Sequence, residues 1–240
     1  AAATITDENF IAGHDLFTGT MGEVVNSGQI YGGSVHLIGQ YVKNHGLIAT
    51  DGGVVTMVAG DEVMIQQIGD TLMVQVDGQE ITNQTDPHGG GTAPTVDAEA
   101  GVVNTGVVTA GDGSVVIGAG DLYSLAVDNV GVIEALGGDA LLASTDGTIL
   151  NRGSIDAGSG SVTLQGPSVV NAGDVHADGD GGTVNVSAGN HAFLMPGSVT
   201  SASGDDGSVT VKAQDGLALV AKDATIDASG ANGFAEVSGN

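Results

Sequence analysis

Apolar residues alternate with polar ones along most of the chain, in short runs that glycine and aspartate interrupt. One run has the pattern V-x-N-x-G-x-[IV] and occurs six times. The copies are VVNSGQI at 24–30, VKNHGLI at 42–48, VVNTGVV at 102–108, VDNVGVI at 127–133, ILNRGSI at 149–155 and VVNAGDV at 169–175. Alternation with a period of two residues predicts β-strands whose apolar side chains share one face.

A second pattern, G-x-[VA]-x-[VLIM], follows each copy, and it also follows two degenerate copies at 193–199 and 220–226. It begins at Gly33, Gly53, Gly113, Gly138, Gly160, Gly182, Gly207 and Gly233, so the repeat is 20 to 26 residues long, apart from one interval of 60. Strands this short cannot bury their apolar faces alone and must stack on neighbours. The chain is therefore predicted to be all-β, a parallel β-helix (β-solenoid) of about nine coils with one loop excursion.

The 60-residue interval is expected to contain additional coils together with an insertion. The run VMIQQIGDTLMVQV at 63–76 fits a further coil, whereas residues 81–100 contain two of the four prolines and no alternation, which is typical of a loop. We therefore expect three parts: coils within 1–80, a loop at 81–100, and the remaining coils within 101–240.

The asparagine and glycine of the first pattern are candidate structural residues. The asparagines are Asn26, Asn44, Asn104, Asn129, Asn151 and Asn171, and the glycines are Gly28, Gly46, Gly106, Gly131, Gly153 and Gly173. Asparagine tolerates turn conformations, and its amide can bond to the asparagine of the next coil. This spacing predicts a structural ladder, with the backbone bending at the glycines.

Charge and composition narrow the range of partners. The chain has 4 basic and 29 acidic residues, a net charge of −25, which repels nucleic acid and anionic lipid surfaces. No apolar run approaches the length of a membrane span, and the opening AAATITDENF lacks the features of a signal peptide. We expect no nucleic-acid binding and no membrane insertion. The absence of cysteine excludes disulfides, thiolate metal sites and cysteine nucleophiles.

The order of the two patterns over residues 24–65 resembles the filamentous haemagglutinin family, the exoproteins of bacterial two-partner secretion. The stretches DENFIAGHDLFTG at 7–19 and IDASGANGFAEVSG at 226–239 are also similar to sequences of that family. The resemblance implies a right-handed parallel β-helix that an outer-membrane secretion partner exports to the surface of a Gram-negative bacterium, as an adhesin or filament segment. Residues 1–80 then resemble the end of the secretion domain, although its N-P-N-G type motif is absent from this sequence.

Catalysis is not expected, and neither is a cofactor. β-Helices that cleave acidic polysaccharides need clustered carboxylates and a basic clamp. The basic residues are Lys43, Arg152, Lys212 and Lys222, and they fall in different repeats. The histidines lack metal-binding spacing, and no G-x-S-x-G motif occurs. A carbohydrate-binding or carbohydrate-active β-helix is the alternative, which exposed aromatic residues would favour; Tyr31, Tyr41 and Tyr123 are scattered in the sequence.

Calcium is the one ligand for which the sequence contains suitable side chains. Turn aspartates precede the second pattern at Asp112, Asp178, Asp180, Asp205 and Asp206. Stacked coils could bring their carboxylates together, and carboxylate oxygens are preferred calcium ligands. The other interpretation is a set of solvated turns, because aspartate also favours turns for backbone reasons.

The leading hypothesis is a non-enzymatic, extracellular β-solenoid with an adhesive or filament-forming function. The repeat at 226–239 keeps apolar Ile226, Phe234 and Val237 without a recognisable polar cap. An uncapped coil leaves strand edges unpaired. We therefore expect end-to-end self-association or the continuation of a longer precursor.

Overall fold

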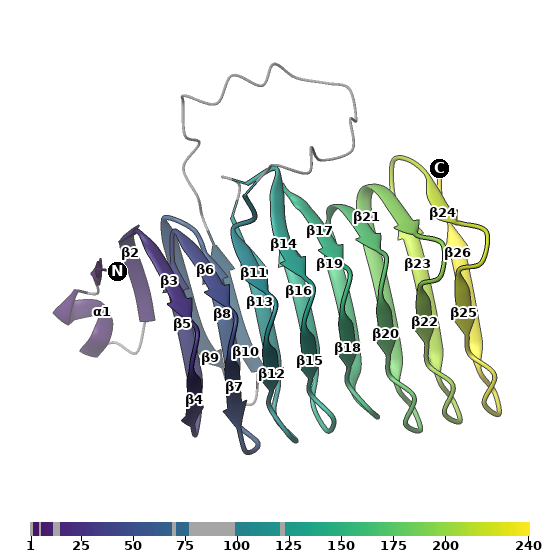
Figure 1. Ribbon diagram of the computed structural model, residues 1–240, viewed down its shortest axis with the longest axis horizontal. Coiled ribbons are helices and arrows are strands. Elements are labelled where there is room, and N and C mark those ends of the chain that lie inside the picture. Colours follow the sequence, from purple (N-terminus) through teal and green to yellow (C-terminus); the bar gives the residue numbers. More distant parts are fainter. Residues whose placement is uncertain (1, 5, 12–14, 69–70, 77–98, 121–122) are drawn as a thin grey trace.

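The computed structural model describes residues 2–4, 6–11, 15–68, 71–76, 99–120 and 123–240. Figure 1 shows an elongated stack of strands, with the N-terminus at one end and the last coil at the other. The described secondary structure consists of strands and one short helix, α1 (Asp7–Ile11). The fold is an all-β parallel β-helix, as the alternating pattern predicts.

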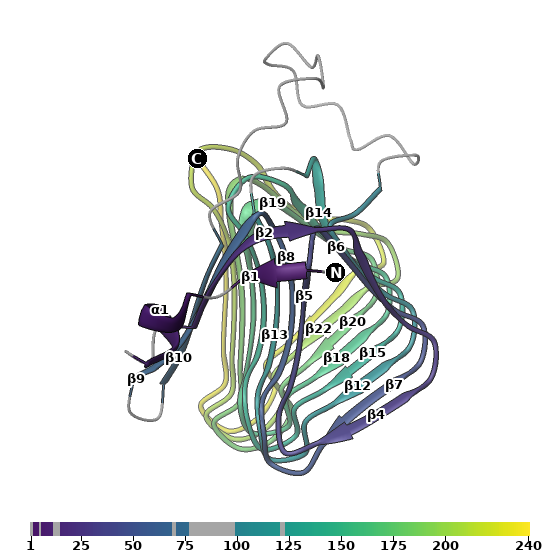
Figure 2. The same cartoon turned by 90° about the vertical axis from the view of Figure 1, so that its left-hand side faces the viewer.

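Each coil contains three strands, which give the rod the three-sided cross-section visible in Figure 2. The first strand ends near the patterned asparagine, the second follows the patterned glycine, and the third is the G-x-V pattern. First strands are β3 (Glu23–Asn26), β6 (Tyr41–Asn44), β11 (Val102–Asn104), β14 (Leu125–Asn129), β17 (Thr148–Asn151) and β24 (Ala218–Val220). Second strands are β4 (Gln29–Gly32), β7 (Leu47–Thr50), β12 (Val107–Thr109), β15 (Val132–Glu134), β18 (Ser154–Asp156), β20 (Asp174–His176), β22 (Val199–Ser201) and β25 (Thr225–Asp227). Third strands are β5 (Val35–Gly39), β8 (Val55–Ala59), β13 (Val115–Ala119), β16 (Ala140–Ser144), β23 (Ser208–Ala213) and β26 (Phe234–Ser238).

Two long strands turn a corner of the rod. In β19 (Ser161–Asn171) and β21 (Thr183–Leu194), the third strand of one coil continues into the first strand of the next. First and third strands therefore join in one 14-stranded sheet, while the second strands form a separate 8-stranded parallel sheet. Each strand of the 8-stranded sheet belongs to a different coil, so the described residues form eight coils, close to the nine expected.

The core lies inside the coils, where apolar side chains stack in register. Val108 of β12 pairs with Ile133 of β15, and Ile133 pairs with Ile155 of β18. All three side chains are fully buried. Ser154, the strand neighbour of Ile155, is partly exposed because successive residues of a strand face opposite sides. Every coil thus adds the same apolar layer to a continuous interior.

The prediction of a further coil at 63–76 is wrong. β9 (Glu62–Ile68) and β10 (Thr71–Val76) form an antiparallel hairpin, which pairs through β9 with β2 (Asp15–Met21). The second coil stacks directly on the third, with Leu47 of β7 paired to Val107 of β12. The period of two residues is common to coil strands and hairpin strands, so it could not separate them. The Gly-Asp pair between the two runs is a sequence typical of a tight hairpin and was the overlooked signal.

The hairpin covers part of the outer face of the solenoid. Val58 of β8 and Val63 of β9 are fully buried and pack with Phe17, Ile38 and Val76. As a result, all residues of β8 and β13 are buried, on the outer face as well as the inner one. The predicted loop at 81–100 lies outside the described residues except for Glu99 and Ala100.

The two ends of the described rod differ. A four-stranded antiparallel sheet, in the order β1 (Ala2–Thr4), β2, β9, β10, belongs to the N-terminal end. Figure 2 shows β1 and β2 running across the upper part of the first coil. At the other end, the inward-facing Val220 of β24 and Val237 of β26 are 37% and 45% exposed, although their partners in the preceding coil, Leu194 and Val211, are fully buried. The apolar layer of the last coil is therefore less covered than that of the first.

Candidate functional site on the outer face of the solenoid

The six patterned asparagines form one row at a corner of the rod. Each side-chain amide nitrogen donates to the amide oxygen of the next asparagine in the row, over distances of 2.8 to 2.9 Å. The row, here called the asparagine ladder, ends where Asn171 donates to the hydroxyl of Thr200 at 3.1 Å. Asn26 is 7% exposed and the other members are at most 1% exposed. Because each amide is bonded within the ladder, the row holds the coils together and offers no free group to a ligand.

The six patterned glycines form a second row beside the ladder. A Cβ atom on Gly131 would lie 2.1 Å from the carbonyl oxygen of Gly106, and one on Gly153 would lie 2.0 Å from that of Gly131. The same contact recurs at Gly46, Gly106 and Gly173. None of the six has a positive φ. Close approach of successive coils, rather than a left-handed backbone, therefore requires glycine here.

Asp178 is the most constrained of the turn aspartates. Its carboxylate accepts hydrogen bonds from the hydroxyls of Ser201 and Ser203, from the backbone N–H of Ser203 at 2.9 Å, and contacts His176 Nδ1 at 3.1 Å. Burial raises the pKa of this carboxyl, but the hydrogen bonds outweigh burial and hold the pKa below its usual value. Asp178 thus connects its coil to the next one.

The other turn aspartates also meet protein donors. Asp180 accepts from the N–H of Asp205, and Asp205 accepts from the N–H of Ala231, at 3.2 and 2.9 Å. Asp206 accepts from Asn232 Nδ2 at 2.9 Å, and Asp112 lies exposed in its turn. Within the described part of the chain, no three histidine or acidic side chains gather where a metal ion could bind. The structure therefore does not bring these five residues together as one calcium site.

Lys43 and Arg152 pair with acidic side chains on neighbouring coils. Lys43 Nζ lies 2.5 Å from Glu23 and 2.7 Å from Glu99, and these carboxylates raise the pKa of the ammonium group. Arg152 pairs with Asp128 of β14. These cations are engaged in separate links between coils and do not converge on one site.

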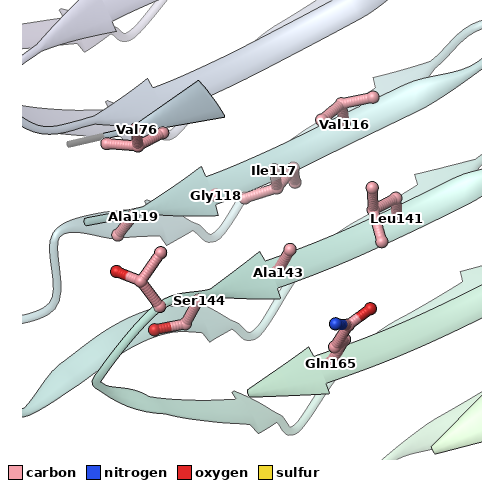
Figure 3. A pocket seen from close by; sticks show the side chains of 10 residues that line it. Val76, Val116, Ile117, Gly118, Ala119, Leu141, Ala143, Ser144 and Gln165 are labelled. Atoms are coloured by element: carbon pink, nitrogen blue, oxygen red, sulfur yellow. The ribbon is translucent and has the colours of Figure 1, made fainter. Parts of the chain in front are cut away.

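A groove on the outer face of the third strands is the feature that sequence reasoning missed. Its first half is a hollow of about 200 Å³ between Val76 of the hairpin and Gln165 of β19, as Figure 3 shows. Its second half is a hollow of about 290 Å³ that extends to Asn190 and Gln214. Ser144, Thr145 and Gln165 line both hollows, so the two are continuous. We call this feature the outer groove.

Register explains the shape of the outer groove. Gly118, Ala143, Gln165 and Ser187 lie on one outward row, each paired with the next across neighbouring strands. The row has no large apolar side chain beyond the hairpin, which leaves a hollow at the surface. The outward positions are distributed over residues 118 to 187, so their adjacency emerges only once the strand register is known. The polar outward residues of the second pattern were the available signal.

The aromatic residues do not line this groove. Tyr41 and Tyr123, far apart in the sequence, meet edge to face with ring centroids 5.5 Å apart, and Tyr123 is buried. Tyr31 is exposed on the second strands, away from the groove. The tyrosines therefore form no shared platform for stacking sugars.

Among known proteins, the chain is similar to solved structures. No family model matches the chain, and no curated protein matches it. Among solved structures the chain is similar to the HMW1 secretion domain from Haemophilus influenzae. The sequence identity is 22% and the TM-score 0.45, over 98% of this chain and 73% of that domain. At this level of similarity, the fold rests on the strand pairing described above. In the described residues, no helix is long and apolar enough to cross a membrane.

Proposed function

We propose that this chain is a non-enzymatic, extracellular β-solenoid of the adhesin or filament type, displayed on the surface of a Gram-negative bacterium. The observation that carries the proposal is the continuous stack of coils, in which apolar rows and the asparagine ladder run in register through the rod. Such a stack makes a stiff, elongated body that holds a contact surface away from its attachment point. The buried residues of the repeats therefore maintain the shape of the rod.

Export through an outer-membrane partner belongs to the same proposal, and it rests on the sequence resemblance. The repeat architecture is compatible with that route because each coil contacts only its neighbours, so folding can propagate coil by coil as the chain emerges. The net charge of −25 keeps the exported rod soluble and opposes side-by-side clumping.

Adhesion is tested with beads coated with the purified chain, which are allowed to settle on cultured epithelial cells and are then washed under flow. We expect more beads to remain than with an albumin coat. A chain carrying Ile155→Asp, which disrupts the core, should lose retention, whereas Ser154→Asp on the outer face should keep it. Equal retention of the Ile155→Asp and wild-type beads, or no retention of wild-type beads, contradicts the adhesive function.

End-to-end association is a further part of the proposal. Its support is the exposure of inward-facing apolar side chains in the last described coil, Val220 and Val237. The strands β1 and β2 lie across the first coil, which disfavours head-to-tail contact, so the exposed ends of two copies are expected to meet. Light scattering and negative-stain microscopy, with and without calcium, should show a dimer that Val237→Asp abolishes and Ser238→Asp retains. A monomer under every condition contradicts this association.

A second candidate function is carbohydrate binding. The outer groove favours it, because amide and hydroxyl side chains line the second hollow without a charged one.

A further inference from the structure

We propose that the outer groove binds an uncharged glycan chain, laid along the rod across β16, β19 and β21. This inference deepens the adhesive function proposed above and rests on it, since it names the class of molecule that the rod would hold. The argument depends on which side chains line the groove, which of their polar groups are unused, and which other ligands the surroundings exclude.

The side-chain amides of the groove are unused by the protein, whereas the Ser144 hydroxyl accepts a hydrogen bond from the N–H of Gly147 at 2.9 Å. Gln165, Asn190 and Gln214 are exposed, and in the described part of the chain their side-chain amides make no hydrogen bond. The asparagine ladder, in contrast, uses its amides fully. A free primary amide offers both donors and acceptors, and Thr145 and Ser187 add hydroxyls. This mixture complements sugar hydroxyls, which also donate and accept.

The end of the groove at the hairpin is apolar. Val76, Val116 and Leu141 line it together with Ala143, as Figure 3 shows. Apolar surface of this kind contacts the C–H faces of sugar rings, and a binding site of mixed lining combines such contacts with a few directed polar groups. The lining extends from Gly118 of β13 across β16 and β19 to Ser187 of β21, which is three strand spacings of ~4.8 Å, or about 14 Å. That length suits an oligosaccharide rather than a single sugar.

Electrostatics disfavour an anionic ligand. The lining of both hollows contains no basic residue. The cation next to the row, Lys212 of β23, lies 3.3 Å from Glu236 of β26 and is paired. A net charge of −25 adds a repulsive field around the whole chain. A neutral glycan avoids both penalties, whereas a uronate or phosphate polymer would meet them without a compensating charge.

The backbone disfavours an extended peptide. Peptides that add a strand to a sheet need an edge with unpaired N–H and C=O groups. β19 is paired with β16 on one side and β21 on the other, and β21 is paired with β19 and β23. Across β19 and β21 the groove therefore offers side chains and no free strand edge.

Binding is tested by titrating the purified chain with neutral linear oligosaccharides of glucose, mannose and galactose, with oligogalacturonate as the acidic probe, in a calorimeter. We expect at least one neutral probe to bind and oligogalacturonate not to bind. Gln165→Leu, which removes the amide at nearly constant volume, should weaken binding at least about fivefold. Gln29→Leu is the matched control, because Gln29 is an exposed strand glutamine of the 8-stranded sheet, away from the groove. Ala143→Phe, which fills the first hollow, should also weaken binding.

Three results overturn the inference: no neutral probe binds, oligogalacturonate binds as well as the neutral probes, or Gln165→Leu and Gln29→Leu bind alike. Circular dichroism of each variant shows that the fold is retained. The bead assay distinguishes a failure of glycan binding in the outer groove from a failure of the adhesive function. Wild-type beads that adhere without any neutral probe binding contradict the groove alone, and groove binding without bead adhesion contradicts the adhesive function alone.

Discussion

Replacing Gly131 by alanine should destabilise the rod, whereas the same change at Gly28 should be nearly neutral. Both glycines lie two residues after a ladder asparagine. A Cβ on Gly131 would lie 2.1 Å from the carbonyl oxygen of Gly106, but the nearest atom to a Cβ on Gly28 is Asn26 Oδ1 at 3.9 Å. The difference arises because Gly131 stacks on a preceding coil, whereas Gly28 belongs to the first coil.

The magnitude follows from the space that the methyl group needs. Non-bonded heavy atoms are ordinarily about 3.5 Å apart. The coil of Gly131 and the preceding coil must therefore separate locally by about 1 Å or more to make room for the methyl group. Overpacking of this kind costs about 1–3 kcal/mol, and stretching the Asn104–Asn129 bond beside it adds about 1 kcal/mol. The reduced entropy of the unfolded chain offsets about 0.4–1 kcal/mol in both variants. A net loss of about 1–3.6 kcal/mol remains for Gly131→Ala.

Thermal melting followed by far-ultraviolet circular dichroism measures the difference. For a chain of this size we expect the midpoint of Gly131→Ala to fall by about 2–14 °C and that of Gly28→Ala to change little or rise slightly. Midpoints of the two variants that agree within about one degree would show that close stacking is not the reason for glycine in this row.

Three further predictions concern the ladder, the core and the acidic turns. Asn129→Ala removes ladder hydrogen bonds of 2.9 and 2.8 Å at a fully buried position, and it should lower the free energy of unfolding by about 4 kcal/mol. Asn26→Ala, at the end of the row, should lower it by about 1–2 kcal/mol. Equal melting points of the two variants would contradict this order. Ile155→Asp should lower the melting point far more than Ser154→Asp, because only the first carboxylate would be buried; similar melting points would reverse the assignment of faces. The lowered pKa of Asp178 means that its stabilising effect is present above the unfolded-state pKa and is lost as pH falls through the folded pKa. Asp178→Asn should therefore reduce the loss of thermal stability on acidification, and an unchanged pH profile would count against this role.

Local pattern was enough to predict the repeating coil. The alternation in the runs ending at Asn129 and Asn151 identifies strands, and their recurrence every 20 to 26 residues requires stacking, because neither strand can bury its apolar face alone. The same reasoning failed at 63–76. A strand of a hairpin and a strand of a coil have the same period, and their difference lies in which strand each one pairs with.

The outer groove could not be predicted from the sequence, because it also depends on which strands pair. Ala143, Gln165 and Ser187 are separated by about one repeat each, and the sequence shows only that they face away from the core. They become neighbours through the pairing of β16, β19 and β21, and Val76 of the hairpin lines the hollow beside them.

Composition and periodicity determine the class of fold, the residues of the core and the position of each asparagine, because these follow from properties that each repeat carries within itself. The requirement for glycine at 131 and the groove beside the hairpin depend on distances between coils. Such distances are set by the register in which distant segments pair, and register is a property of the assembled stack.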